Sequence, residues 1–105
     1  MTKVDFSKIA GRIYAGRPNG IKARSLFKIE NCDSLEGKVE VIFPENARSI
    51  SSSFFLGMFG ESIRKFGSKE KFQSHYTFRA NKQIINQIDK VIDRALVAMA
   101  FNSGQ

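Results

Sequence analysis

The chain has 105 residues, of which 42% are hydrophobic and 26% are charged. This size and composition are typical of one globular domain and exclude a disordered, collagen-like or membrane-spanning chain. No segment holds the roughly 20 apolar residues of a membrane helix, and the charged N-terminus does not resemble a secretory signal. We therefore expect a single domain over residues 1–105, cytoplasmic and without membrane contact, with a frayed tail at 102–105.

Cys32 and His75 are the only cysteine and the only histidine in the sequence. One cysteine cannot form a disulfide within the chain, and one cysteine with one histidine is too few for a zinc site. Cys32 lies in a polar stretch without a clear partner to stabilise a thiolate, so we expect it to be buried or inert. We predict no metal site and no cofactor.

The net charge of +7 is unevenly distributed along the chain. Residues 1–28 contain seven basic side chains and one acidic one, whereas residues 29–63 contain two basic and six acidic ones. Residues 64–82 contain six basic side chains and one acidic one, and the remainder adds no net charge. This distribution favours an anionic partner, which could be a nucleic acid, a phosphate group or an acidic protein surface, although a solvated basic face would give the same pattern.

The first third of the chain predicts a strand, a turn and a helix. Residues 9–14 (IAGRIY) combine β-branched and aromatic side chains, as strands do. Two glycines, a proline and an asparagine in residues 15–20 (AGRPNG) predict a tight turn. Apolar side chains among basic ones in residues 21–31 favour a helix with one buried stripe, and residues 31–37 (NCDSLEG) are typical of a loop.

The middle of the chain contains the clearest strand and a strongly apolar helix. Residues 38–43 (KVEVIF) alternate between two faces until Pro44, which predicts a strand. A polar connection and three serines follow, and apolar residues then recur with helical spacing up to Gly67. We predict a buried helix over 54–66 that the serines open and Gly67 ends.

The last third predicts a strand and the most regular helix. Residues 71–79 (KFQSHYTFR) alternate with period two, which indicates a strand. After Asn81, which could serve as N-cap, apolar residues form a helical stripe up to Met99. The alternation of three strands with three helices predicts an α/β domain: a small single-layer sheet, parallel or mixed, with about three helices packed on it.

Ser51, Ser52 and Ser53 are the most unusual local feature, because they lie at the start of a hydrophobic helix. The first backbone N–H groups of a helix have no partner inside the helix, and the helix dipole favours negative charge there. One serine is enough to cap the helix, so a phosphate on another would be tolerated or stabilised. Capping alone is the simpler explanation of the same serines.

Four segments together resemble the STAS-like family: AGRPNG followed by Arg24, VEVIF, ISSSFFLGMFG and FGS. The resemblance extends from about Ile13 to the last helix. It implies a relative of the STAS fold of anti-sigma factor antagonists, in which a serine at the start of the equivalent helix is phosphorylated by a partner kinase. The matching residue is Ser52, although the antagonists usually have aspartate before this serine and glycine two residues after it, where this chain has Ser51 and Phe54. The resemblance also implies a histidine-kinase-type ATPase as partner.

From these observations we expect a regulatory protein-interaction module. It would dock a partner through the helix that the serines open, and phosphorylation of Ser52 would switch it. Arg17 could pair with a phosphate or carboxylate there, because a guanidinium binds such groups with two hydrogen bonds. A phenylalanine exposed beside the serines would mark the docking patch. The residues expected to bind the partner are Arg17, Gly20, Arg24, Ser51, Ser53, Phe54 and Phe55.

Two other functions are weaker. Nucleic-acid binding would use the basic N-terminal third and the segment 64–82, but no RNP aromatic signature or helix-turn-helix pattern is present. A small hydrolase would need Ser52 and His75 as a dyad, together with an oxyanion site and an orienting acid that the sequence does not display. The glycine spacing of a nucleotide-binding P-loop is also absent. We therefore expect a protein that is not an enzyme.

Overall fold

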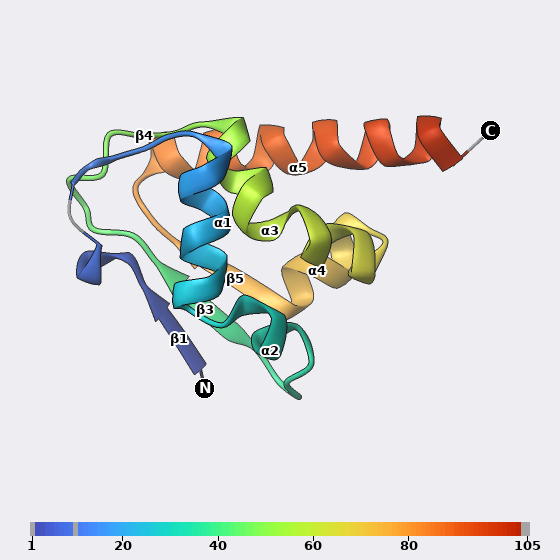
Figure 1. The fold of residues 1–105 in the computed structure, drawn as a ribbon, viewed down its shortest axis with the longest axis horizontal. Helices are drawn as coiled ribbons and strands as arrows, with labels where there is room; N and C mark the ends of the chain where they lie inside the picture. Colours follow the sequence, from blue (N-terminus) through green and yellow to red (C-terminus); the bar gives the residue numbers. More distant parts are fainter. Residues whose placement is uncertain (1, 10, 104–105) are drawn as a thin grey trace.

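The computed structural model describes residues 2–9 and 11–103, and this part of the chain contains both helices and short strands (Figure 1). The domain is α/β, with five α-helices, one 3-10 helix and two small parallel sheets among the described residues. The elements, in chain order, are β1 Thr2–Asp5, η1 Phe6–Lys8, β2 Ile13–Tyr14, α1 Arg17–Leu26, α2 Ile29–Asp33, β3 Val39–Ile42, β4 Ser49–Ile50, α3 Ser52–Phe66, α4 Lys69–His75, β5 Tyr76–Arg79 and α5 Lys82–Ser103.

The larger sheet has the order β1–β3–β5, and all its strands are parallel. Val41 in the central strand pairs with Val4 on one side and Phe78 on the other. Val39, Val41 and Phe43 are buried, whereas Glu40 and Ile42 are partly exposed, so the predicted period-two strand over 38–43 is confirmed. The second sheet is a separate pair, β2 and β4, so the expected single sheet is in fact two.

The N-terminal strand β1 was not predicted, and the strand predicted over 9–14 is mostly wrong. Val4 and Phe6 are buried with a spacing of two, which is a weak strand signal among charged residues. Of residues 9–14, only Ile13–Tyr14 form a strand, and Ala10 lies outside the described residues. Two residues bury too little apolar surface for periodicity to reveal them.

The tight turn predicted over 15–20 is wrong, because α1 already begins at Arg17. Pro18 is compatible with this start, since the first turn of a helix needs no N–H donor from it. The helix predicted over 21–31 is interrupted after Leu26, because Lys28 adopts a left-handed conformation with φ of 54°. A short second helix, α2, then occupies part of the predicted loop.

The two long helices are confirmed. α3 is capped by Ser51 and ends at Gly67, which adopts a left-handed conformation suited to glycine. At the start of α5, the side-chain oxygen of Asn81 accepts a hydrogen bond from the Ile84 N–H at 2.9 Å. α5 continues to Ser103 and extends beyond the other elements (Figure 1), so it overlaps the tail expected at 102–105; residues 104–105 lie outside the described residues.

The strand predicted over 71–79 is half wrong, because its first part is the helix α4. Ser68 caps this helix by accepting a hydrogen bond from the Lys71 N–H at 3.1 Å. Phe72 and Tyr76 are buried and Ser74 is exposed, a spacing of four that fits a helix rather than a strand. The strand β5 begins only at Tyr76.

Helices α1 and α3 pack unusually closely through two glycines. A Cβ atom on Gly20 would collide with the backbone carbonyl of Phe54, and a Cβ on Gly57 would lie 2.5 Å from the carbonyl oxygen of Arg17. Any larger residue at either position would force the backbones apart. This contact therefore holds the start of α1 against the first turns of α3.

Replacing Gly57 with alanine should lower the free energy of unfolding by about 1–3 kcal/mol, as overpacking does. Gly60 is a matched control in the same helix, because a Cβ there would meet only the Leu56 side chain, at 3.8 Å. Gly60→Ala should leave stability unchanged or raise it by up to about 1 kcal/mol through backbone entropy. Urea denaturation followed by circular dichroism measures both, and equal effects would contradict the close helix contact.

Candidate functional site

Ser51, Ser52 and Ser53 form the serine turn at the start of α3, and their hydroxyl groups have two different roles. Ser51 is the N-cap, and its Oγ accepts hydrogen bonds from the Phe54 N–H at 3.0 Å and the Gly16 N–H at 3.3 Å. The second bond links the start of α3 to the residue that precedes α1. Ser51 therefore has a structural role, which removes it from the expected partner-binding surface.

Ser52 and Ser53 are exposed and occupy the first turn of α3. The Ser51 hydroxyl already caps the helix, so these two hydroxyls are not needed for capping. They lie where the free N–H groups and the helix dipole favour a negative charge. Both residues are thus accessible to a kinase or to a partner.

Arg17 is exposed and is the first residue of α1, where this helix lies against α3. Its backbone faces Gly57, and it lines a hollow of about 320 Å³ together with Leu56 and Gly60. Leu56 and Gly60 follow Ser52 and Ser53 by whole turns, so they share one side of α3 with them. Arg17 is therefore positioned along the serine-bearing side of the helix.

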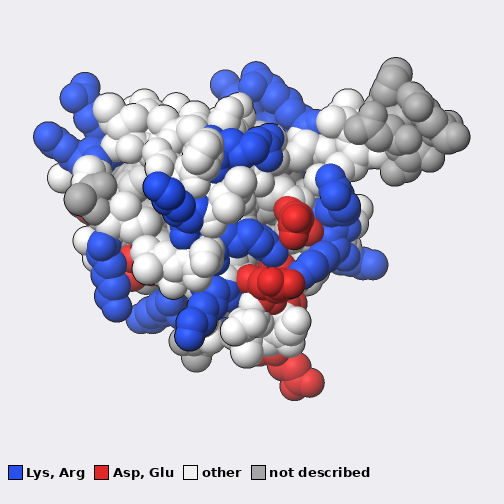
Figure 2. All heavy atoms as spheres, in the orientation of Figure 1, with Lys and Arg blue, Asp and Glu red and all other residues white. Residues whose placement is uncertain are grey.

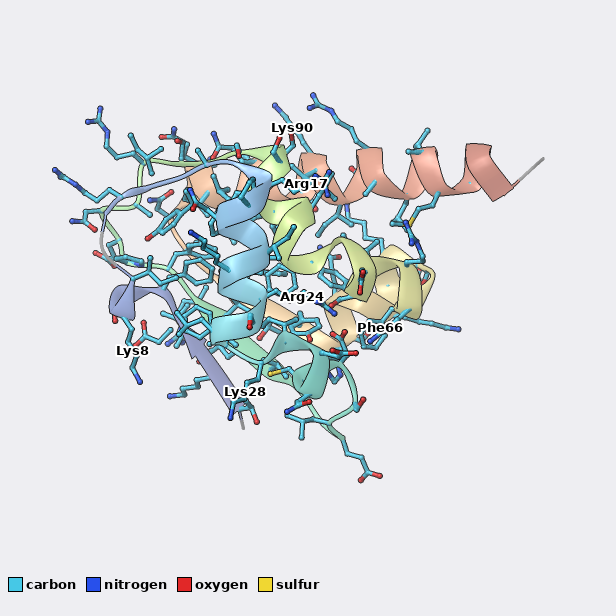
Figure 3. The ribbon with its side chains drawn as sticks, in the orientation of Figure 1. Lys8, Arg17, Arg24, Lys28, Phe66 and Lys90 are labelled. Atoms are coloured by element: carbon cyan, nitrogen blue, oxygen red, sulfur yellow. The ribbon has the colours of Figure 1, made fainter. Side chains whose placement is uncertain are left out.

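Lys90 of α5 adds a second exposed cation on this side of the molecule. α5 is fixed near the serine turn because the side-chain oxygen of Gln87 accepts a hydrogen bond from the Ile50 N–H at 2.9 Å. Lys90 follows Gln87 by about one turn. Figure 3 shows Arg17 and Lys90 on the side where α1 and α3 begin against α5.

The structure removes Phe54, Phe55 and Gly20 from the expected docking residues. Phe54 is 4% exposed and Phe55 is fully buried, because both side chains pack into aromatic clusters of the core. Gly20 is buried in the contact between α1 and α3. Neither Phe54 nor Phe55 is therefore the exposed phenylalanine that would have marked a docking patch.

Arg24 is also a structural residue, because its guanidinium is bound on the inside of the fold. It donates hydrogen bonds to the Met58 carbonyl at 2.7 Å and to the Ser62 hydroxyl at 2.9 Å. It forms an ion pair with Asp33 at 3.2 Å, and the Asp33 side chain is only 3% exposed. Arg24 therefore joins α1, α2 and α3 and is not available to a partner.

Asp33 is the centre of this polar cluster, which the sequence did not reveal. Its carboxylate accepts a hydrogen bond from the Tyr76 hydroxyl and pairs with Lys65 at 3.4 Å. Burial and the neighbouring Asp33 carboxylate raise the pKa of Tyr76, so its hydroxyl remains a donor at any physiological pH. These partners are separated by up to 43 positions in the sequence, so no local pattern connects them.

His75 and Cys32 lie together near the end of α3, far from the serines. Nε2 of His75 is 2.6 Å from the Cys32 carbonyl oxygen, and the imidazole packs against Phe66. Since Ser52 and Phe66 are the two ends of α3, Ser52 and His75 are separated by roughly 20 Å and cannot form a dyad. Cys32 is buried as predicted, and burial raises the pKa of its thiol.

No group of three or more His, Cys, Asp or Glu side chains in residues 2–9 and 11–103 is arranged to hold a metal ion. Within the same ranges, no helix combines the length and the apolar character needed to cross a bilayer. Comparisons of the chain with protein-family profiles, with curated proteins and with solved structures gave no match.

Replacing Arg24 with alanine should lower the free energy of unfolding by about 3 kcal/mol, because the buried Asp33 carboxylate would lose its closest cation. Lys65 pairs with the same carboxylate but is 47% exposed, so Lys65→Ala should lower stability by no more than about 1 kcal/mol. Thermal and urea denaturation of the two variants provide the measurement. A small effect of Arg24→Ala would show that the cluster is not a structural centre.

Proposed function

We propose that this chain is a regulatory protein-docking module, similar to STAS-like proteins, that binds its partner on the side where α1 and α3 begin. The partner class that the family resemblance implies is an ATPase of the histidine-kinase type. Phosphorylation of Ser52 would switch the interaction. The observation that carries the proposal is that Ser51 alone caps α3 and leaves Ser52 and Ser53 exposed.

The charges around the serine turn support a phosphate-dependent switch. A phosphate on Ser52 would lie at the N-terminal end of a 15-residue helix, where the dipole stabilises negative charge. Arg17 and Lys90 are exposed on the same side and are cations that such a phosphate attracts. The modification would therefore be compatible with the fold and would change the charge that a docking partner meets.

Nucleic-acid binding is the second candidate, because the net charge of +7 favours any polyanion. Single strands are usually held by aromatic side chains on which bases stack. In the described part of the chain, every phenylalanine and tyrosine side chain whose placement is given is buried or partly buried, within the core or packed against it. Binding would thus depend on charge alone, which makes a protein partner the better supported proposal.

The proposal predicts that partner binding and fold stability respond to different serines. Ser51→Ala should lower the free energy of unfolding by about 1 kcal/mol through loss of the cap. The double variant Ser52→Ala with Ser53→Ala should change stability by less than about 0.5 kcal/mol, since both side chains are exposed. It should nevertheless lose the partner in affinity purification from cells that express the chain.

A phosphate mimic separates the switch from damage to the fold. Ser52→Glu should fold at least as stably as the wild type, because acidic residues are favourable in the first turn of a helix. Its partner binding should weaken about tenfold or more, since the partner would have to desolvate the added charge. Intact-mass analysis of the purified wild type tests for the phosphate directly. Full binding by both serine variants would contradict the proposal.

A further inference from the structure

An apolar groove lies between β2 and α1 and reaches Phe54 at the start of α3. It encloses about 520 Å³, and its walls include Ile13 from β2 and Leu26 from α1. These two side chains are 63% and 65% exposed, although they border the same hollow. Exposed apolar side chains around a concave surface are typical of a binding site, because an isolated protein gains nothing from leaving them in water.

Tyr14 is a second, independent feature of the groove. Its side chain lines the groove, and its hydroxyl is buried without a hydrogen-bond partner among the described residues. Buried hydroxyl groups nearly always have a partner, because desolvation without one is unfavourable. An acceptor oxygen in the groove would supply this partner after a small displacement of the atoms that cover the hydroxyl.

The charged residues of the segment that lines most of the groove, from Ile9 to Leu26, are all basic. Lys22 lines the groove, and Lys8 and Arg12 directly precede the lining residues Ile9 and Ile13. In Figure 2, Lys and Arg side chains border the uncharged surface over α1. In Figure 3, Lys8 and Lys28 lie near the C-terminal end of α1. Between Phe6 and Ile29 the sequence contains no Asp or Glu; its basic residues there are Lys8, Arg12, Arg17, Lys22, Arg24 and Lys28.

We propose that this groove binds an acidic peptide segment of a partner protein. An apolar side chain of the segment would insert between Ile13 and Leu26, and a peptide carbonyl would accept a hydrogen bond from the Tyr14 hydroxyl. Acidic side chains on either side of this anchor would face Lys22 and the neighbouring cations. This inference rests on the proposed docking function only in taking the ligand to be part of a protein. It adds the chemical character of the partner segment that binds.

Apolar walls favour a peptide over a nucleic acid as the occupant. A phosphate backbone would meet Lys22 but would leave the apolar surface of Ile13 and Leu26 without a complementary group. An acidic segment with an aliphatic or aromatic anchor satisfies the charge and the apolar walls together.

The test is selection from a phage-displayed library of random 12-residue peptides on the immobilised protein, followed by fluorescence anisotropy with the selected peptides. Enriched peptides should carry a net negative charge and a Leu, Ile or Phe anchor. Leu26→Asp should weaken their binding about tenfold or more. Val97→Asp is the matched control, because Val97 is 69% exposed on α5 and lies outside the groove, and it should leave binding unchanged.

Tyr14→Phe separates specific binding from general adhesion to an apolar surface. Removing the unpartnered hydroxyl should leave the melting temperature unchanged or raise it, yet should weaken peptide binding about threefold to tenfold. Lys22→Glu should weaken binding further and reduce its dependence on salt. The inference would be overturned if no peptide were recovered, if the enriched peptides lacked acidic residues, or if Leu26→Asp and Val97→Asp had equal effects. Binding of a DNA oligonucleotide in place of peptides would also overturn it.

The groove and the serine turn can fail separately. A cellular partner that is lost from the Ser52 and Ser53 variant but retained by Leu26→Asp would overturn the groove inference and leave the docking function standing. If peptide binding depended on Leu26 and Tyr14, and the cellular partner bound equally well to the Ser52 and Ser53 variant, the groove inference would be supported and the serine switch would be overturned.

Discussion

The close contact between Gly20 of α1 and Gly57 of α3 holds together the two helices on which the proposed binding face is built. Because neither glycine has a Cβ, the two helix backbones approach each other directly. This approach places Arg17 along the serine-bearing side of α3 and leaves the far side of α1 facing β2. The serine turn and the apolar groove are therefore two parts of one surface, joined by the hydrogen bond from the Gly16 N–H to Ser51.

The Asp33 cluster fixes the other half of α1. Arg24 links this helix to Asp33 of α2 and to Met58 and Ser62 of α3, while Tyr76 brings in the start of β5. A buried ion pair of this kind contributes little net stability compared with apolar packing, but losing one partner is strongly unfavourable. Its effect is to hold one arrangement of the helices, so Arg24, which the sequence suggested for binding, instead helps to position the proposed binding face.

The sequence predicted the elements whose own residues carry a regular pattern. The strand around Val41, the serine-capped helix and the long C-terminal helix each contain a clear period, the two helices also have a capping residue, and all three are confirmed. The start of α1 was mistaken for a turn because Pro18 and Gly20 are common in turns, although proline also suits the first turn of a helix and Gly20 packs against α3. Phe54 and Phe55 belong to the apolar helical stripe of α3 and are buried with it, whereas the pairing of Arg24 with Asp33 depends on non-local packing, which no local pattern encodes. Ser52 and Arg17 were identified from sequence and are exposed, so they remain as binding candidates.

Site-specific photo-crosslinking in cells that express the chain tests whether a protein partner docks where α1, β2 and α3 meet. A photo-reactive amino acid would replace Ser53, Ile13 or, as control, Gln73, which is exposed on α4. The same protein should be captured through positions 53 and 13 and not through position 73. Capture of nucleic acid, or equal capture of protein from all three positions, would contradict it.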